Sequence, residues 1–216
     1  MNLAKAIALI LLPIAALQAM AQSRILAPNN WGIASWELRS FLGETVYRVV
    51  TLDDEVVLQA DSNASASAMF SEQRVDLNAT PLLQWRWRTD SALGTEVDET
   101  FKSGDDYAAR IYVVRKGGLA FWRTKALNYV WASKQAVGSR WPNPFAGNNV
   151  QMLAVDSGST ELGQWRHHVR DIKADWLAAF GETIDSLDGI AIMTDTDNSG
   201  LAIKSWYADV RFTPQL

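Results

Sequence analysis

Residues 82–90 have the sequence LLQWRWRTD, in which apolar and polar side chains alternate from Leu83 onward. Leu83, Trp85 and Trp87 share one face of an extended chain, and the Gln and Arg residues between them share the other. A period of two is typical of a β-strand with one buried face, because successive side chains point to opposite sides. The stretch therefore predicts a strand whose Leu and Trp side chains enter a core.

The rest of the chain contains further runs of this kind. They are short, rich in β-branched or aromatic residues, and separated by Gly, Asn and Asp, which favour turns. They cover residues 45–52, 55–60, 66–70, 106–116, 127–132, 150–155, 189–194 and 202–212. This pattern predicts an all-β fold, namely an antiparallel two-sheet β-sandwich of jelly-roll type.

Residues 171–182, DIKADWLAAFGE, are the one internal segment with convincing helical spacing. Ile172 and Trp176 lie four positions apart, Asp171 can cap the start of a helix, and Gly181 can end it. We expect a short helix near 171–181 that closes an end or an edge of the sandwich.

The N-terminus has the features of a secretory signal peptide. Lys5 precedes the apolar run 6–17, and the residues 19–21, AMA, place alanine at −3 and −1 of a cleavage site. The apolar run is shorter than the roughly 20 residues that span a membrane. We therefore expect a signal peptide over 1–21, a single β-sandwich domain over 22–216, a periplasmic or secreted location, and no membrane span after cleavage.

Composition narrows the classes of function. The 216 residues include no cysteine, and their formal net charge of −4 argues against a nucleic-acid partner, which would need clustered Lys and Arg. The chain has no G-x-S-x-G motif, P-loop or dinucleotide-binding fingerprint. Ten tryptophans are the unusual feature. Some must lie in the core, and others can be exposed for binding.

The segment DTDNSG, residues 195–200, resembles the start of a helix–loop–helix calcium site. That class needs a bidentate Glu at position twelve, which here is Trp206, and the flanking segments are strands, so the class is excluded. Three hypotheses remain. The segment can be a turn held by its own Asp and Asn side chains, a calcium site with Asp195 and Asp197 as ligands, or a ligand-binding loop that includes Asn198.

Residues 103–110, SGDDYAAR, form a second acidic segment. Asp105 and Asp106 lie where a loop enters a strand, and Asp106 and Arg110 share a strand face, so they can form a charge pair. Adjacent carboxylates beside an Arg can bind sugar hydroxyls or act as acid and base. The alternative is a structural salt bridge at the start of the strand.

Residues 127–145 combine a strand with an aromatic loop. Tyr129 and Trp131 share a strand face, and the following Gly, Pro and Asn loop contains Trp141 and Phe145. Aromatic rings near polar groups suit stacking on the apolar face of a sugar ring. The alternative is that Trp141 folds back over a satellite hydrophobic cluster.

Taken together, several segments resemble an uncharacterised family of exported bacterial proteins, domain of unknown function 3047 (DUF3047). They are GDDYAARIYVV (104–114), LNYVW (127–131), NPF (143–145), the W-R pair at 165, FGE (180–182), IAIMTDTDNSG (190–200) and YADVRF (207–212). The family has no established activity to transfer. More loosely, the D-x-D loop followed by a Y-x-D-V-x-F strand is similar to galactose-binding-like jelly-roll modules, which often bind sugars through loop aromatics and can carry a structural calcium ion.

These observations predict an exported protein that binds carbohydrate or another polar small ligand, such as a glycan or a cell-envelope component, through an aromatic and acidic face. The expected ligand-binding residues are Asp105, Asp106, Arg110, Tyr129, Trp131, Trp141 and Asn198. The candidate metal ligands are Asp195 and Asp197, for a structural calcium ion, and the sequence indicates no other cofactor. The alternatives are a carboxylate-based glycan hydrolase or lyase, and a non-catalytic envelope or interaction domain whose aromatics are mostly core. A single site that includes both acidic segments requires the segment with Asp106 and the segment with Asp195 to lie close together in the fold.

Overall fold

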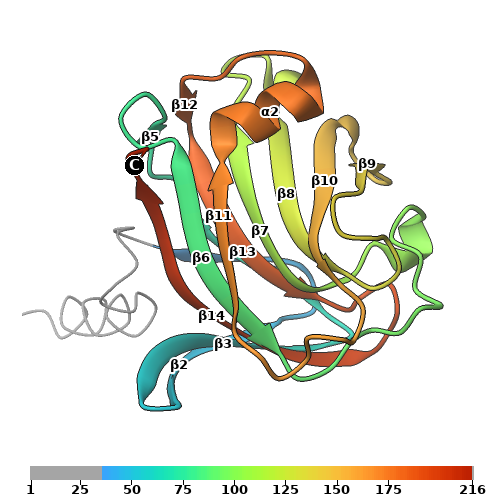
Figure 1. Cartoon of the computed structure of the whole chain (residues 1–216). Helices are drawn as coiled ribbons and strands as arrows, with labels where there is room; N and C mark the ends of the chain where they lie inside the picture. Colours follow the sequence, from blue (N-terminus) through green and yellow to red (C-terminus); the bar gives the residue numbers. More distant parts are fainter. Residues whose placement is uncertain (1–35, 216) are drawn as a thin grey trace, which may run out of the picture.

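Strand β6 (Leu82–Thr89) buries one face as its alternation predicts. In the computed structural model, which describes residues 36–215, Leu83, Trp85 and Trp87 are at most 1% exposed, and the residues between them are half-buried. The described residues form two main sheets packed face to face (Figure 1). The expected signal peptide, residues 1–21, lies outside the described residues.

The larger sheet, sheet A, has seven strands. Their order is β1 (Glu37–Leu42), β4 (Ala66–Ser71), β13 (Gly189–Asp195), β7 (Tyr107–Arg115), β8 (Lys125–Ala132), β10 (Gly147–Ser157) and β9 (Arg140–Asn143). The smaller sheet, sheet B, has five strands in the order β11 (Arg166–Asp171), β6, β14 (Ala202–Thr213), β3 (Glu55–Asn63) and β2 (Val46–Leu52). A short pair joins β12 (Ser186–Leu187) to β5 (Val75–Asp76), and two 3₁₀ turns are η1 (Lys102–Gly104) and η2 (Phe121–Arg123).

The chain crosses repeatedly between the sheets, as in a jelly roll: β3 is followed by β4, β6 by β7, and β13 by β14. This arrangement confirms the predicted β-sandwich. Among the described strands, one pair departs from antiparallel order, because β10 runs parallel to β8. The intervening strand β9 pairs antiparallel with the far edge of β10, so the chain reverses direction twice between β8 and β10.

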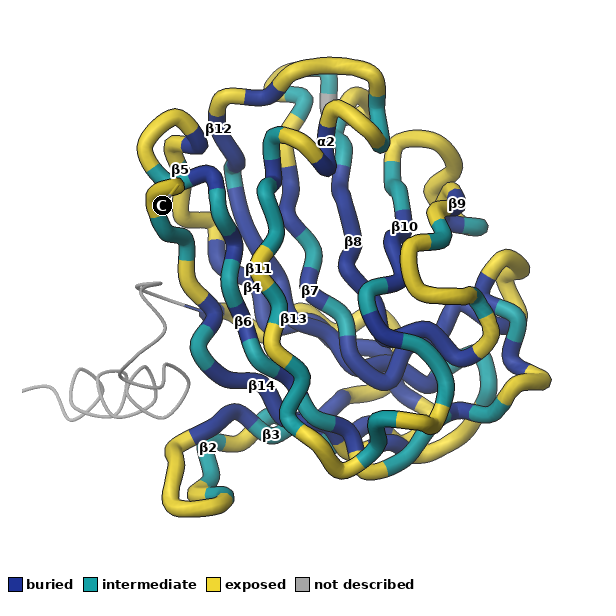
Figure 2. The backbone as a smooth tube through the Cα atoms, viewed as in Figure 1, coloured by how far each residue is buried: buried dark blue, intermediate teal, exposed yellow. Residues whose placement is uncertain are grey.

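The core between the sheets is strongly aromatic. The rings of Trp85 and Tyr129 lie 5.2 Å apart, and those of Trp87 and Trp131 lie 6.5 Å apart, across the interface between sheets B and A. Of the nine described tryptophans, seven are buried, so most of the tryptophan excess serves packing. Figure 2 shows the buried central strands and the exposed turns that connect them.

The single described α-helix, α2 (Ile172–Phe180), confirms the predicted segment. The Asp171 side chain accepts a hydrogen bond from the backbone N–H of Ala174, and Gly181 ends the helix in the left-handed conformation at φ 70°. The helix crosses one end of the sandwich (Figure 1) and places Ile172 and Trp176 in the core. Within residues 36–215, no helix is long and apolar enough to cross a membrane.

Candidate functional site

A hollow of about 440 Å³ lies on the face of sheet A that points away from sheet B. Its place follows from strand alternation. Ile111 and Val113 of β7 enter the core between the sheets, so Arg110 and Tyr112 point to the opposite face, where both line the hollow. The hollow is therefore built on the outer surface of the larger sheet and not between the two layers.

Side-chain size explains why this face is concave. Ala66 of β4 and Ala126 of β8 line the hollow, and their small side chains leave space above the sheet. Phe41 and Phe145 also line the hollow, and their rings are 65% and 58% exposed. Small residues flanked by exposed rings form a cavity with apolar walls that are open to solvent.

A β-bulge in β7 shapes the end of the hollow. Met193 of β13 pairs with Arg110, but Asp195 pairs with Tyr107. Between these pairs, two residues of β7 oppose one residue of β13. Regular alternation would put Tyr107 on the same face as Ile111. The extra residue instead places Tyr107 in the outer cluster, as bulges beside functional sites re-aim side chains.

The bulge brings Arg110 next to Asp195. Arg110 Nη1 lies 3.3 Å from Asp195 Oδ2, and Nη2 donates to the Met193 sulfur at 3.0 Å. Burial raises the pKa of Asp195 well above its ordinary value, and the Arg110 guanidinium only partly opposes this effect. Burial alone would lower the pKa of Arg110, but the nearby carboxylates of Asp195 and Asp105 outweigh it and raise that pKa, so Arg110 stays charged.

This buried pair leaves polar atoms without partners. Arg110 Nε and Asp195 Oδ1 are buried, and neither forms a hydrogen bond within the described part of the chain. Buried polar groups are normally hydrogen-bonded, so unsatisfied groups of this kind often mark a place where a ligand, ion or water completes the set.

Asp106 joins the start of β7 to the loop after β13. Its Oδ1 accepts hydrogen bonds from the backbone and side-chain nitrogens of Asn198 at 3.2 Å each, and its Oδ2 accepts one from the Ser199 backbone at 2.6 Å. The segments that contain Asp106 and Asp195 therefore lie close together, as a single site requires. The expected charge pair of Asp106 with Arg110 is wrong, because Asp106 precedes the strand and Arg110 pairs with Asp195.

The loop itself is a well-formed turn. The Gly200 backbone N–H donates to the Thr196 carbonyl at 2.9 Å, and Gly200 has a φ of 68°, a conformation in which glycine carries no steric cost. The turn hypothesis is thus correct for the backbone of this loop. It leaves the side chains of Asp195, Asp197 and Asn198 lining the hollow.

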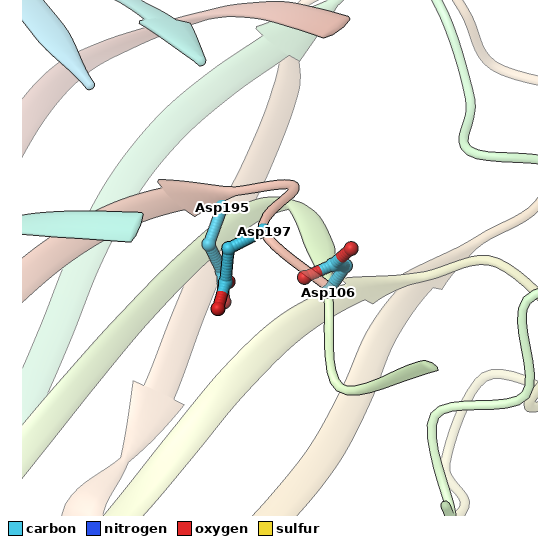
Figure 3. A group of neighbouring side chains, drawn as sticks. All are labelled: Asp106, Asp195 and Asp197. Carbon is cyan, nitrogen blue, oxygen red and sulfur yellow. The ribbon is translucent and has the colours of Figure 1, made fainter. Parts of the chain in front are cut away.

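Three carboxylates gather at this turn, and we name Asp106, Asp195 and Asp197 the acid cluster (Figure 3). One oxygen from each lies within 4.8 Å of the others. Asp195 and Asp197 project in the same direction from β13 and its loop, and Asp106 approaches from the start of β7. Burial, and then the Asp106 carboxylate, raise the pKa of Asp197. Within residues 36–215, Asp195 is the one member with an ion-pair partner.

A second network positions the rim of the hollow. Asn143 Nδ2 donates to both oxygens of Asp105, at 3.0 and 2.8 Å, while Asn143 Oδ1 accepts from the backbone N–H groups of Phe145 and Ala146. Tyr107 Oη also donates to Asp105 Oδ1 at 2.9 Å. Burial raises the pKa of Asp105, although Arg110 and the Asn143 hydrogen bonds oppose that effect. Asp105 thus fixes the turn that carries the Phe145 ring.

The aromatic part of the predicted site is wrong. Tyr129 and Trp131 are at most 1% exposed and lie in the core between the sheets, because their side of β8 faces sheet B. Trp141 lies on edge strand β9, where it packs against Met152 in a satellite cluster. None of the three lines the hollow, and for Trp141 the structure agrees with the alternative hypothesis.

The rings that do line the hollow are Phe41, Tyr112 and Phe145. A sequence signal for Tyr112 was its alternation with Ile111 and Val113, and for Phe145 its place in a turn-rich segment. Asn128 of β8 lies on the strand face opposite Tyr129 and was not identified from the sequence. Its side chain reaches the hollow, and none of the hydrogen bonds described within residues 36–215 uses it.

Comparisons with known proteins give a family match and distant structural likenesses. A family model described as "Protein of unknown function (DUF3047)" matches residues 34–211. A search of the curated proteins finds no match. Among solved structures, TmCBM61 in complex with beta-1,4-galactotriose has 12% identity and a TM-score of 0.41 over 89% of this chain and all of that one. A structure described as "CBM4 structure and function" has 9% identity and a TM-score of 0.36, over 88% of this chain and 94% of that one.

A third structure is the xyloglucanase domain of NopAA, a type three effector from Sinorhizobium fredii, in complex with cellobiose. It has 12% identity and a TM-score of 0.36 over 82% of this chain and 97% of that one. Because these TM-scores are below 0.5, the function of this chain has to be argued from its own residues.

Proposed function

This chain belongs to the DUF3047 family, and because the description of that family names no activity, we propose from the site alone that the protein binds a neutral glycan in the hollow of sheet A. One observation carries the proposal. Two exposed Phe rings and a set of fixed polar side chains converge on one cavity.

The cavity matches what a sugar requires. A sugar ring has an apolar C–H face that stacks on aromatic rings, and its hydroxyl groups need several fixed hydrogen-bond partners. Phe41 and Phe145 offer the rings, while Asn128, Asp197 and Asn198 offer donors and acceptors. The volume of about 440 Å³ lies in the range of roughly 300–1,000 Å³ that is usual for small-ligand pockets.

The charges favour a neutral ligand. Asp105, Asp195 and Asp197 line the hollow, and Arg110 is the one positively charged residue among the described lining residues. A carboxyl group repels an anionic ligand when ionised and offers it no positive charge when protonated. Sulfated, phosphorylated or uronic-acid glycans would therefore bind worse than neutral ones.

A glycan array followed by calorimetry tests the proposal. The chain should bind neutral glycans, and Phe145→Ala and Asn128→Ala should each weaken that binding by roughly 5- to 30-fold, the effect of about 1–2 kcal/mol. Phe101→Ala is the matched control, because Phe101 is a 63% exposed ring that does not line the hollow. Absence of glycan binding, or equal effects of Phe145→Ala and Phe101→Ala, would refute the proposal.

A carboxylate-based hydrolase or lyase is the second candidate. It is favoured by the raised pKa values of Asp105 and Asp195 in the same cavity, as a general acid needs. Against it, Asp106 is engaged by loop amides and Asp195 Oδ1 is buried. Release of reducing ends from a bound glycan, if it is lost in Asp105→Asn, would support catalysis. Glycan that stays intact after long incubation would show that the protein binds it without cleaving it.

Export is part of the same proposal. We infer a periplasmic or secreted protein from the composition of residues 1–21, in which Lys5 precedes an apolar run and the residues 19–21 supply a cleavage site. N-terminal sequencing of the protein recovered from the periplasm or medium should begin at Gln22. An uncleaved cytoplasmic product would contradict it.

A further inference from the structure

We propose that the acid cluster of Asp106, Asp195 and Asp197 is a binding site for a calcium-like divalent cation at the edge of the hollow. This inference goes beyond glycan binding and does not depend on it. Three carboxylate oxygens within 4.8 Å of one another repel each other, and the ion pair with Arg110 neutralises only one of the three groups within residues 36–215.

An independent observation singles out this cluster from ordinary surface acids. The Asp195 side chain is only 3% exposed, and its Oδ1 has no hydrogen-bond partner among the described residues. Its carboxylate projects beside that of Asp197 (Figure 3). A buried carboxylate oxygen without a donor is costly, and a coordinated cation would satisfy it.

The geometry fits one ion. Ca²⁺ binds oxygen ligands at about 2.3–2.6 Å, so two ligands of one ion lie up to roughly 4.6–5.2 Å apart. Any two of the cluster oxygens, at 4.8 Å or less, therefore lie within the span of two ligands of one ion. The ligands are all oxygen, which hard cations prefer, and the irregular set suits Ca²⁺ better than Mg²⁺, which demands near-octahedral geometry.

The cluster also has a rigid support and an open side. Asp106 is held by the Asn198 and Ser199 backbone N–H groups, so the ion would join the start of β7 to the loop after β13. Asp195 and Asp197 line the hollow, whereas Asp106 does not. Since Ca²⁺ takes 6–8 ligands, its remaining positions would face the hollow, where water or ligand hydroxyls can fill them.

Calorimetric titration of CaCl₂ into the chelator-treated full chain tests the site directly. We expect one saturable site per chain, and a rise in the thermal midpoint on adding Ca²⁺. Asp197→Asn should weaken Ca²⁺ binding at least tenfold. This variant should fold normally, because Asp197 is half-buried and forms no ion pair in the described part of the chain.

The matched control is Asp54→Asn, which removes the same charge from an exposed turn. Asp54 has a φ of 64°, which Asn tolerates. It should leave Ca²⁺ binding unchanged. The proposal is overturned if no saturable binding occurs up to about 10 mM Ca²⁺, tenfold above the roughly 10⁻³ M limit of extracellular modules. It is also overturned if both variants bind Ca²⁺ like the parent chain. In that case a proton shared between carboxyl groups of the acid cluster, and not a cation, would reduce their repulsion.

A second measurement tests coupling to the ligand, and this part depends on the proposed function. Glycan affinity should fall when Ca²⁺ is replaced by a chelator, and Asp197→Asn should abolish that difference. Equal affinity in both buffers overturns the coupling. A chain that binds Ca²⁺ but no glycan in either buffer refutes the proposed function and supports the cation site.

Discussion

Asp106 accepts hydrogen bonds from both the backbone and the side-chain nitrogen of Asn198, 92 positions further along the chain, at 3.2 Å each. This contact holds the loop after β13 against the start of β7. It brings together the two acidic segments, residues 103–110 and 195–200, which local sequence patterns identify only as separate segments. The integrity of the hollow should therefore depend on Asp106, although Asp106 itself does not line it.

Asp106→Ala should lower the free energy of unfolding by about 2 kcal/mol, measured by urea denaturation in the presence of a chelator. The half-buried N–H groups of Asn198 and Ser199 would lose their acceptor. Asp106→Asn should lower the free energy of unfolding by less, because its side-chain oxygen can still accept one of these hydrogen bonds. If Asp106→Ala is as stable as the parent chain, the anchoring role is wrong.

Arg110→Met should destabilise the fold by roughly 3–5 kcal/mol, because it leaves the Asp195 carboxylate buried without its cation. Adding Asp195→Asn to this variant should recover part of the loss. A double-mutant cycle from urea denaturation checks the coupling. If the losses of unfolding free energy in the two single variants add in the double variant, the 3.3 Å contact between Arg110 and Asp195 contributes nothing to stability.

Asp156 should make stability depend on pH. Burial raises its pKa, but hydrogen bonds from His168, Trp87 and Arg166 outweigh burial and lower it overall. A lowered folded-state pKa stabilises the fold above the unfolded pKa of about 3.9, and this stabilisation is lost as the pH falls through the folded value.

Asp156→Asn should therefore be less stable than the parent at pH 7, and the gap should narrow below about pH 4. Urea denaturation between pH 3 and pH 7 measures it. A gap that stays constant over this range would mean that the charge of Asp156 is not the source of its effect.

Ala126→Leu should fill the hollow and reduce glycan affinity by at least about tenfold, while changing the free energy of unfolding by roughly 1 kcal/mol or less. Ala126 lines the cavity, and its small side chain helps to keep it open. Ala178→Leu on the exposed side of α2 is the matched control. Calorimetry measures the glycan affinity of both variants. An Ala126→Leu variant with the affinity of the parent chain would show that the ligand binds outside the hollow.

Asp171→Ala should destabilise the chain by about 1 kcal/mol, because the N–H of Ala174 loses its capping acceptor. Urea denaturation and far-ultraviolet circular dichroism would follow the loss. Asp171→Asn, which preserves a capping oxygen, should be close to the parent. Equal losses in both variants would mean that the charge of Asp171, and not its cap, is responsible.

The sequence by itself determined the local elements. The alternation over 82–90 was sufficient for strand β6, and Asp171 and Gly181 were sufficient for the bounds of α2, because both depend on contacts within a few residues. The polar residues Asp105, Asp195, Asp197 and Asn198 were also identifiable, because Asp and Asn beside strand ends are a local signal.

Only the tertiary structure decided which face of each strand became the site. In β8, Tyr129 and Trp131 point one way and Ala126 and Asn128 the other, and both sides are largely apolar. Alternation separates the two sides, but the packing of sheet B against one of them selects the core, and that contact joins residues far apart in the chain. The bulge that turns Tyr107 outward and the meeting of Asp106 with Asn198 are likewise products of long-range pairing.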